Sequence, residues 1–171
     1  MSCALKRNGA PSLDELMASP AFPTDEQLKS GPTVVIECIE EIPCNPCETC
    51  CPKNAISVGE PITNLPRVQF EKCIACGACV AACPGLAIYI KDYTYSDTHA
   101  SIMFPFEYLP RPNPGDTVCM VSRCGEEICE GTVLAVRTPK AYDHTAVVTA
   151  VFPKEHFHEV VSMRRLPREV I

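Results

Sequence analysis

The stretch Cys73-Ile-Ala-Cys76-Gly-Ala-Cys79-Val-Ala-Ala-Cys83-Pro84 decides the fold of this chain of 171 residues. Its spacing is one with which thiolates hold 4Fe–4S clusters, and the fourth cysteine of such a run can ligate a second cluster. The two-residue gaps let a tight loop point three thiolates at one cluster, and the small residues between them let backbone N–H groups approach its sulfurs. Zinc is the weaker alternative, because a zinc site usually needs two separated Cys-x2-Cys knuckles or histidine ligands, and no histidine precedes His99.

A second, incomplete copy of this run lies 32 residues earlier in the chain. The matching segments are Cys44 with Cys76, Cys47 with Cys79, Cys51-Pro52 with Cys83-Pro84, and residues 55–58 with 87–90. Each half is predicted to contain a short strand, a cysteine loop, one or two helical turns and a second short strand. We therefore expect a duplicated unit with a pseudo-two-fold axis.

The first half departs from the repeat where its first ligand should stand. That position is occupied by Glu41, whereas Cys38 lies three residues earlier. A longer loop can still return a thiolate to the cluster, because only direction and reach decide ligation. Two alternatives stay open: Glu41 supplies an oxygen ligand, or the site holds a three-iron cluster. Cys50 beside Cys51 is a further ambiguity, and its alignment with Ala82 favours a spare buried thiol.

The spacing predicts a crossed ligand set for two 4Fe–4S clusters. A three-residue gap is one helical turn, which directs the fourth cysteine of each run toward the cluster of the other half. The expected ligands are Cys38, Cys44, Cys47 and Cys83 for the first cluster, and Cys73, Cys76, Cys79 and Cys51 for the second. Of the other cysteines, Cys119, Cys124 and Cys129 match no ligand template and are interpreted as core or surface thiols, and Cys3 carries no site inference.

Local patterns divide the chain into three parts and predict an α+β fold. Residues 1–31 are expected to form an N-terminal arm, partly extended, with capping boxes at 12–15 and 24–27; it is either loose or laid on a partner subunit. Residues 32–91 form the duplicated cluster-binding unit. In residues 92–171, strands are expected at 98–106, 117–123, 128–136 and 145–152, and a short helix from Pro153. Such short strands with tight turns suggest a small antiparallel barrel.

Composition narrows the function classes. The first residues have no secretory signal, so the 13 cysteines are expected to lie in a reducing cytoplasm. No apolar run is long enough for a membrane span, and a formal charge of −6 argues against nucleic acid as a partner. The sequence has no glycine-rich dinucleotide loop and no nucleophile motif. These features indicate an electron relay that is not itself a catalyst, with substrate chemistry on partner subunits.

Several segments together carry a resemblance to a known family: Val35–Cys47, Cys51-Pro52, Gly59–Pro66 and Cys83–Ile88. They resemble the ferredoxin-like small subunit of multi-subunit, FAD-dependent amino-acid or amine dehydrogenases, similar to proline dehydrogenase, sarcosine oxidase and opine or hydrogen-cyanide-forming oxidase complexes. This form of the subunit is typical of anaerobic bacteria. Cys50 departs from the pattern, because a small residue without a thiol is expected there.

The resemblance implies a bacterial dicluster ferredoxin-like fold followed by the β-rich domain. It also implies a hetero-oligomer with an FAD-dependent dehydrogenase subunit and a flavoprotein similar to pyridine-nucleotide-disulfide reductases. FAD or FMN would be bound by those partners only, and this subunit would relay electrons between their flavins. Four carboxylates beside the first cluster are expected to form either an acidic docking patch or an ordinary solvated loop surface: Glu37, Glu40, Glu41 and Glu48.

Two other functions remain open. A free, diffusing ferredoxin with two 4Fe–4S clusters would need only residues 32–91, so the arm and the β-rich part favour permanent docking. Alternatively, the clusters are structural or regulatory, and the β-rich domain binds a ligand or a partner. That alternative predicts clusters that cannot be reduced and reoxidised reversibly.

Overall fold

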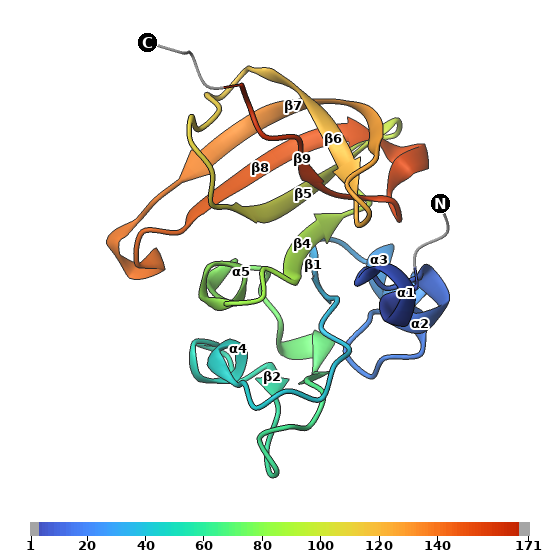
Figure 1. Cartoon of the computed structure of the whole chain (residues 1–171), viewed down its shortest axis with the longest axis vertical. Coiled ribbons are helices and arrows are strands. Elements are labelled where there is room, and N and C mark those ends of the chain that lie inside the picture. The colour runs from blue at the N-terminus through green and yellow to red at the C-terminus, as the bar shows by residue number, and fades with distance from the viewer. Residues whose placement is uncertain (1–3, 168–171) are drawn as a thin grey trace.

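The computed structural model describes residues 4–167, which form one long antiparallel sheet, a small second sheet and several short helices (Figure 1). The order of the seven-stranded sheet is β1 (Thr33–Ile36), β4 (Ile88–Asp92), β5 (His99–Phe106), β8 (Ala146–Pro153), β7 (Glu127–Arg137), β6 (Thr117–Ser122) and β9 (Val160–Met163). The second sheet pairs β2 (Ile56–Ser57) with β3 (Arg67–Val68). The chain is therefore a mixed α and β structure.

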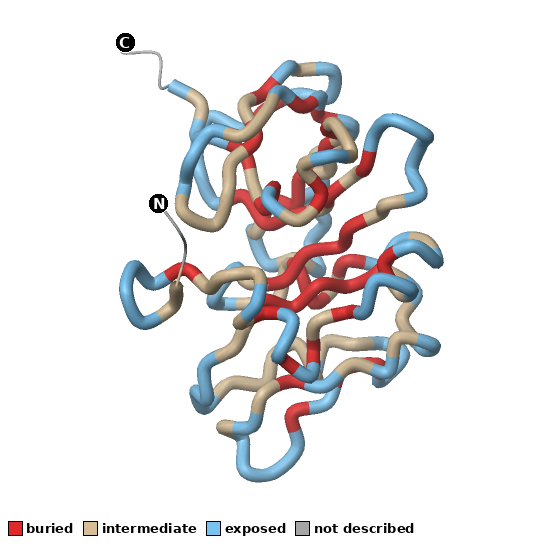
Figure 2. The backbone as a smooth tube through the Cα atoms, turned by 90° about the vertical axis from the view of Figure 1, so that its right-hand side faces the viewer, coloured by how far each residue is buried: buried red, intermediate tan, exposed pale blue. Residues whose placement is uncertain are grey.

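Strands β5 to β9 curl into a half-barrel around a hydrophobic core (Figures 1 and 2). Inward-facing side chains such as Phe104, Met120 and Phe152 are fully buried. The register shifts within β6 and β7, and such bulges bend and twist a sheet. Strand β9 comes back into contact with β5 without pairing with it. The four strands predicted from the sequence in this part are confirmed to within one residue at each end.

The predicted helix after Pro153 is wrong. The segment holds only a 3-10 turn, η3 (Lys154–His156), and is followed by strand β9, which the sequence patterns did not predict. Phe157, Val160 and Met163 are buried in the core of the half-barrel. Burial of these apolar side chains along the β6 edge therefore outweighs the local preference for a helix start at the proline.

The cysteine-rich part lies at the other end of the same sheet, where β1 pairs with β4 and β4 pairs with β5. It carries the helices α4 (Pro46–Thr49) and α5 (Ala78–Ala82) and the 3-10 helix η1 (Phe70–Lys72). The repeat is visible in the backbone, because Asn54 and Leu86 both have positive φ, at 49° and 53°. Their amides donate to the carbonyl oxygens of Cys51 and Cys83, respectively. The two halves thus turn in the same way after their last cysteine.

The arm contains the helices α1 (Leu5–Asn8), α2 (Leu13–Met17) and α3 (Asp25–Leu28). Both predicted capping boxes are confirmed, at the start of α2 and of α3. Leu16 and Ala21 are fully buried, and Leu28 joins the core of the half-barrel. The described part of the arm therefore packs against its own chain and is not loose. Across residues 4–167, none of the helices has the length and hydropathy needed to cross a membrane.

Candidate iron–sulfur centre

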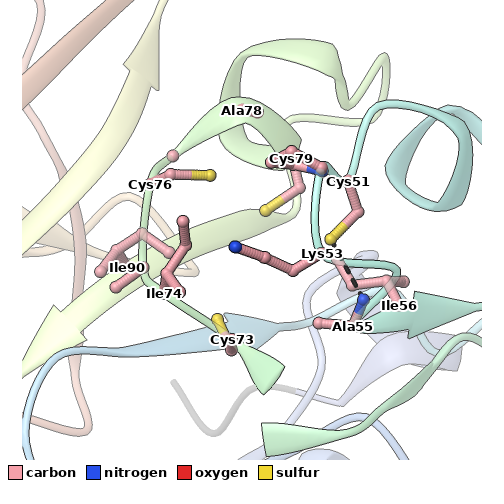
Figure 3. A pocket seen from close by; sticks show the side chains of 13 residues that line it. Cys51, Lys53, Ala55, Ile56, Cys73, Ile74, Cys76, Ala78, Cys79 and Ile90 are labelled. Atoms are coloured by element: carbon pink, nitrogen blue, oxygen red, sulfur yellow. Dashed lines mark hydrogen bonds between the residues drawn. The ribbon is translucent and has the colours of Figure 1, made fainter. Parts of the chain in front are cut away.

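Four of the predicted ligands surround one cavity, which we call the Cys73 site. Its cysteines are Cys51, Cys73, Cys76 and Cys79. Three of them come from the loop before α5 and from its first turn, and Cys51 follows α4. Figure 3 shows their four sulfur atoms directed toward a common space. Apart from Lys53, the other side chains that line this space are apolar.

The other four predicted ligands line a second cavity, which we call the Cys38 site. Its cysteines are Cys38, Cys44, Cys47 and Cys83. Cys38 lies just beyond β1, Cys44 precedes α4, Cys47 lies in its first turn, and Cys83 caps the C-terminus of α5. Ile36, Val58 and Ile88 contribute apolar walls to this cavity.

The two cavities are built from segments that exchange their last cysteine. Helices α4 and α5 contact each other. Cys51 follows the run of the first half but lines the Cys73 site, whereas Cys83 follows the run of the second half and lines the Cys38 site. The eight side chains are thus grouped in the pattern that the three-residue gap predicts. Ligation of iron by these groups remains a prediction.

The alternative ligands of the first half lie elsewhere. Glu41 is exposed, and neither Glu41 nor Cys50 is among the described residues that line the two cavities. The Cys50 thiol donates instead to the backbone carbonyl oxygen of Cys47, with a sulfur–oxygen distance of 3.6 Å. Among Cys38, Glu41 and Cys50, only Cys38 therefore faces the cavity.

Backbone amides contact the last cysteine of each half in the same way. The amide of Ala55 donates to Cys51 Sγ at 3.2 Å, and the amide of Ala87 donates to Cys83 Sγ at 3.5 Å. Burial acts to raise the pKa of Cys51, but the amide of Ala55 and its neighbours outweigh it, so this pKa is lowered. Such N–H···S bonds favour a thiolate and tune the potential of a cluster bound to it.

Three other cysteine thiols of the two sites have pKa values shifted in the opposite direction. Burial raises the pKa of Cys47 to about 12 and also raises the pKa values of Cys38 and Cys79, and nearby cysteines add to these shifts. Metal binding would therefore have to release protons from these thiols. A set of four sulfur donors with mostly apolar walls fits a soft metal centre such as an iron–sulfur cluster.

The loop between Cys76 and Cys79 depends on a glycine. Gly77 has φ of +83°, a conformation that side chains with a Cβ rarely adopt. A Cβ at this position would also lie 2.6 Å from Met103 Sδ. Gly77 therefore lets the loop turn close against β5 and bring both thiols to the same cavity.

One carboxylate beside the Cys38 site has a structural partner. Glu37 directly precedes Cys38, and its side chain is only 4% exposed. It accepts two hydrogen bonds from the Arg123 guanidinium, at 2.7 and 2.5 Å, and Arg123 also donates to the carbonyl oxygen of His158 at 2.7 Å. The prediction that Glu37 belongs to an exposed acidic patch is therefore wrong. Glu40 and Glu41 are exposed and Glu48 is partly exposed.

The remaining cysteines lie outside both cavities. Cys119 on β6 and Cys129 on β7 are partly buried free thiols, as expected. Cys124 is disulfide-bonded, so its interpretation as a thiol is wrong. Cys3 lies outside the described residues.

Comparisons with known proteins agree with this chemistry. Residues 66–89 match the family model of the 4Fe-4S binding domain. The chain is 39% identical over 87 residues to the polyferredoxin-like subunit of the aliphatic sulfonate oxidoreductase of Pyrococcus furiosus, covering 50% of this chain and 45% of that protein. It is 50% identical over 50 residues to one subunit of the ion-translocating oxidoreductase complex of Methanosarcina acetivorans, covering 29% of this chain and 18% of that protein.

A third relative is the ferredoxin-type protein NapF of Haemophilus influenzae, which is 39% identical over 56 residues, or 32% of each chain. The chain therefore contains a 4Fe–4S, ferredoxin-like domain that is related to those of oxidoreductase subunits. It spans less than half the length of these three relatives. No solved structure is significantly similar to it. None of the three relatives is described as part of an amino-acid or amine dehydrogenase, so that finer resemblance stays a prediction.

Proposed function

We propose that this chain is the electron-transfer subunit of a flavin-dependent amino-acid or amine dehydrogenase complex and relays single electrons through two 4Fe–4S clusters. The observation that carries the proposal is the division of eight cysteines into two sets of four, each around its own cavity. Four thiolates per site are what a 4Fe–4S cluster requires, and such a cluster exchanges one electron at a time.

The shared helices support a relay between the two sites. Helix α4 lies between Cys44 and Cys51, and α5 lies close to Cys76 and Cys83, so each helix has ligands of one site before it and a ligand of the other site after it. Both sites therefore belong to one lobe, residues 32–91, which we call the cluster-binding lobe and in which α4 and α5 contact each other.

The rest of the chain supports a permanent subunit in preference to a free ferredoxin. A minimal relay would need only residues 32–91. In this chain β4 pairs with β5 of the half-barrel, and Leu16 and Leu28 of the arm are buried against the chain. The arm and the half-barrel thus give the cluster-binding lobe additional fixed surfaces. Two of the three relatives are named as subunits of oxidoreductase complexes, which also favours a hetero-oligomer.

In this proposal the partners are an FAD-dependent dehydrogenase subunit and a flavoprotein similar to pyridine-nucleotide-disulfide reductases. The partners bind the flavins and the substrate, and this chain connects the flavins. Its own residues hold the clusters, exclude water from their apolar walls and supply N–H donors to their ligands. The chain has no substrate-transforming role of its own.

Anaerobic purification of the native protein from its source tests the proposal. We expect it to co-purify at a fixed ratio with yellow, flavin-containing subunits, and its iron centres to be reduced when the amine or amino-acid substrate is added. Isolation as a brown monomer that serves unrelated oxidoreductases would contradict the proposal and favour a free ferredoxin. Centres that cannot be reduced and reoxidised reversibly would contradict any relay.

A further inference from the structure

The two cavities differ in the sign of one charged side chain. Among the described residues that line them, the Cys73 site has a single charged side chain, that of Lys53. The Cys38 site likewise has a single one, that of Glu40. The other lining residues are cysteines and uncharged side chains. Two sites that the repeat makes similar in ligands are therefore opposite in local charge.

Lys53 reaches toward the Cys73 site. It stands two residues after Cys51, and Figure 3 shows its side chain extending toward the space between the four sulfur atoms. The corresponding residue of the other half is Gly85, 32 positions later, which carries no side chain. A Cβ built at Gly85 would lie 4.0 Å from Cys83 Sγ, so this backbone position directly adjoins a ligand in its own half. The positive charge is therefore present at one site and absent at the other.

Glu40 stands two residues after Cys38, in the longer loop that distinguishes the first half. The position 32 residues later is Lys72, which lines neither cavity. Across residues 4–167, neither Glu40 nor Lys53 takes part in an ion pair. The two charges are therefore not neutralised by neighbours. Glu37, also beside the Cys38 site, differs because Arg123 compensates its charge.

Electrostatics gives these two charges a consequence for electron transfer. Reduction adds one negative charge to a cluster, and nearby charge and solvent exposure set cluster potentials. A neighbouring ammonium stabilises the reduced form, whereas a neighbouring carboxylate destabilises it. Both side chains are exposed at the mouths of their sites, so solvent weakens the two effects without changing their sign. The cluster beside Lys53 should therefore be the easier of the two to reduce.

We propose that Lys53 and Glu40 polarise the relay, so that an electron passes from the Cys38 site to the Cys73 site and rests there at equilibrium. In this step the cluster at the Cys38 site is oxidised by one electron, the cluster at the Cys73 site is reduced by one, and no proton moves. The inference rests on the proposed function, because it requires a cluster in each site. It adds the direction of electron transfer within the chain.

An EPR-monitored redox titration of the full chain, with clusters reconstituted anaerobically, tests this polarity. Cys38→Ser and Cys73→Ser variants, each retaining the other site, assign the two signals. We expect the Cys73 site to have the higher potential. We compare the sites by the ratio of their equilibrium constants for reduction, Cys73 site over Cys38 site. Lys53→Gln should lower this ratio about tenfold, which corresponds to about 59 mV for a one-electron couple. Glu40→Gln should raise the equilibrium constant of the Cys38 site by a similar factor.

Two matched variants separate charge from other effects. Lys53→Arg keeps the positive charge and should retain the polarity. Glu41→Gln removes the exposed neighbour of Glu40, which lines neither cavity, and should have a smaller effect than Glu40→Gln. Equal potentials in the unmodified chain, a reversed order, or an unchanged ratio in both Lys53→Gln and Glu40→Gln would overturn the inference. If the Lys53→Gln variant fails to bind iron, Glu40→Gln becomes the deciding variant. An unchanged ratio of the two equilibrium constants in Glu40→Gln would then be enough to overturn the inference.

Iron analysis distinguishes failure of the inference from failure of the proposed function. A chain with two complete clusters and unpolarised potentials would contradict only the polarity. A chain that binds no iron would contradict both, because the polarity has no meaning without the clusters.

Discussion

The buried ion pair between Glu37 and Arg123 provides the sharpest test of how the cluster-binding lobe is held to the half-barrel. Glu37 follows β1 directly before Cys38, and Arg123 follows β6. The two side chains are 4% and 10% exposed, and two hydrogen bonds join them. In an Arg123→Met variant the carboxylate keeps its buried position but loses both donors.

The burial of this pair sets the size of the expected effect. Removing one partner of a buried ion pair destabilises a protein by about 3–5 kcal/mol, because the remaining charge is left without compensation. For a domain of this size, each kcal/mol lowers the midpoint of thermal unfolding by about 2–4 °C. We therefore expect Arg123→Met to lower the midpoint by about 6–20 °C. A Glu37→Gln/Arg123→Met double variant should lose less than Arg123→Met alone, since it removes both charges.

Circular dichroism during anaerobic heating, at one fixed scan rate, measures these differences. The matched control is Arg164→Met, because Arg164 and Glu127 also form an ion pair but are 67% and 56% exposed. An exposed pair contributes no more than about 1 kcal/mol, so this control should shift the midpoint by only a few degrees. Two results would refute the reasoning. One is an unfolding midpoint of Arg123→Met equal to or above that of Arg164→Met, and the other is a midpoint of the double variant equal to or below that of Arg123→Met.

Three further predictions concern single residues. Burial lowers the pKa of Lys91 to about 7, from the 10.5 expected in the unfolded chain. Between these two pH values the unfolded state binds more protons than the folded state, so the free energy of unfolding should rise with pH. Thermal unfolding of Lys91→Met from pH 7 to 9.5 should lack this rise, and an equal rise in both proteins would contradict the cause. Cys50→Ala should leave the iron content unchanged, whereas loss of one cluster's iron would identify Cys50 as a ligand. Gly77 has a positive φ, and an added Cβ would lie close to Met103 Sδ. Gly77→Ala should therefore destabilise the chain by more than about 1 kcal/mol. An unchanged midpoint of thermal unfolding would show that the loop adapts.

Local sequence patterns predicted those parts of the fold that local physics determines. The strands of the half-barrel follow alternating and β-branched residues, and the capping boxes at α2 and α3 need only residues three positions apart. Strand β9 was missed because the burial of Val160 and Met163 depends on β6, which is distant in the sequence. The packing of the arm was missed for the same reason, since a single Leu16 does not reveal the surface that covers it.

The repeat predicted the grouping of the cysteines, because a fixed spacing and one helical turn determine where each thiol can reach. It could not predict the features in which the halves differ. Lys53 and Glu40 align with Gly85 and Lys72, so a comparison of the halves offers no signal for either charge. The pair between Glu37 and Arg123 joins residues 86 positions apart and has no local signature.

Crossed ligation by Cys51 is the central claim, and iron analysis of two double variants tests it most directly. Cys51→Ser/Cys73→Ser removes two cysteines from the same cavity, whereas Cys51→Ser/Cys38→Ser removes one from each. We expect the first variant to retain one cluster, with about four iron atoms per chain, and the second to retain none. The opposite result, with iron retained only by Cys51→Ser/Cys38→Ser, would assign Cys51 to the Cys38 site and contradict this account.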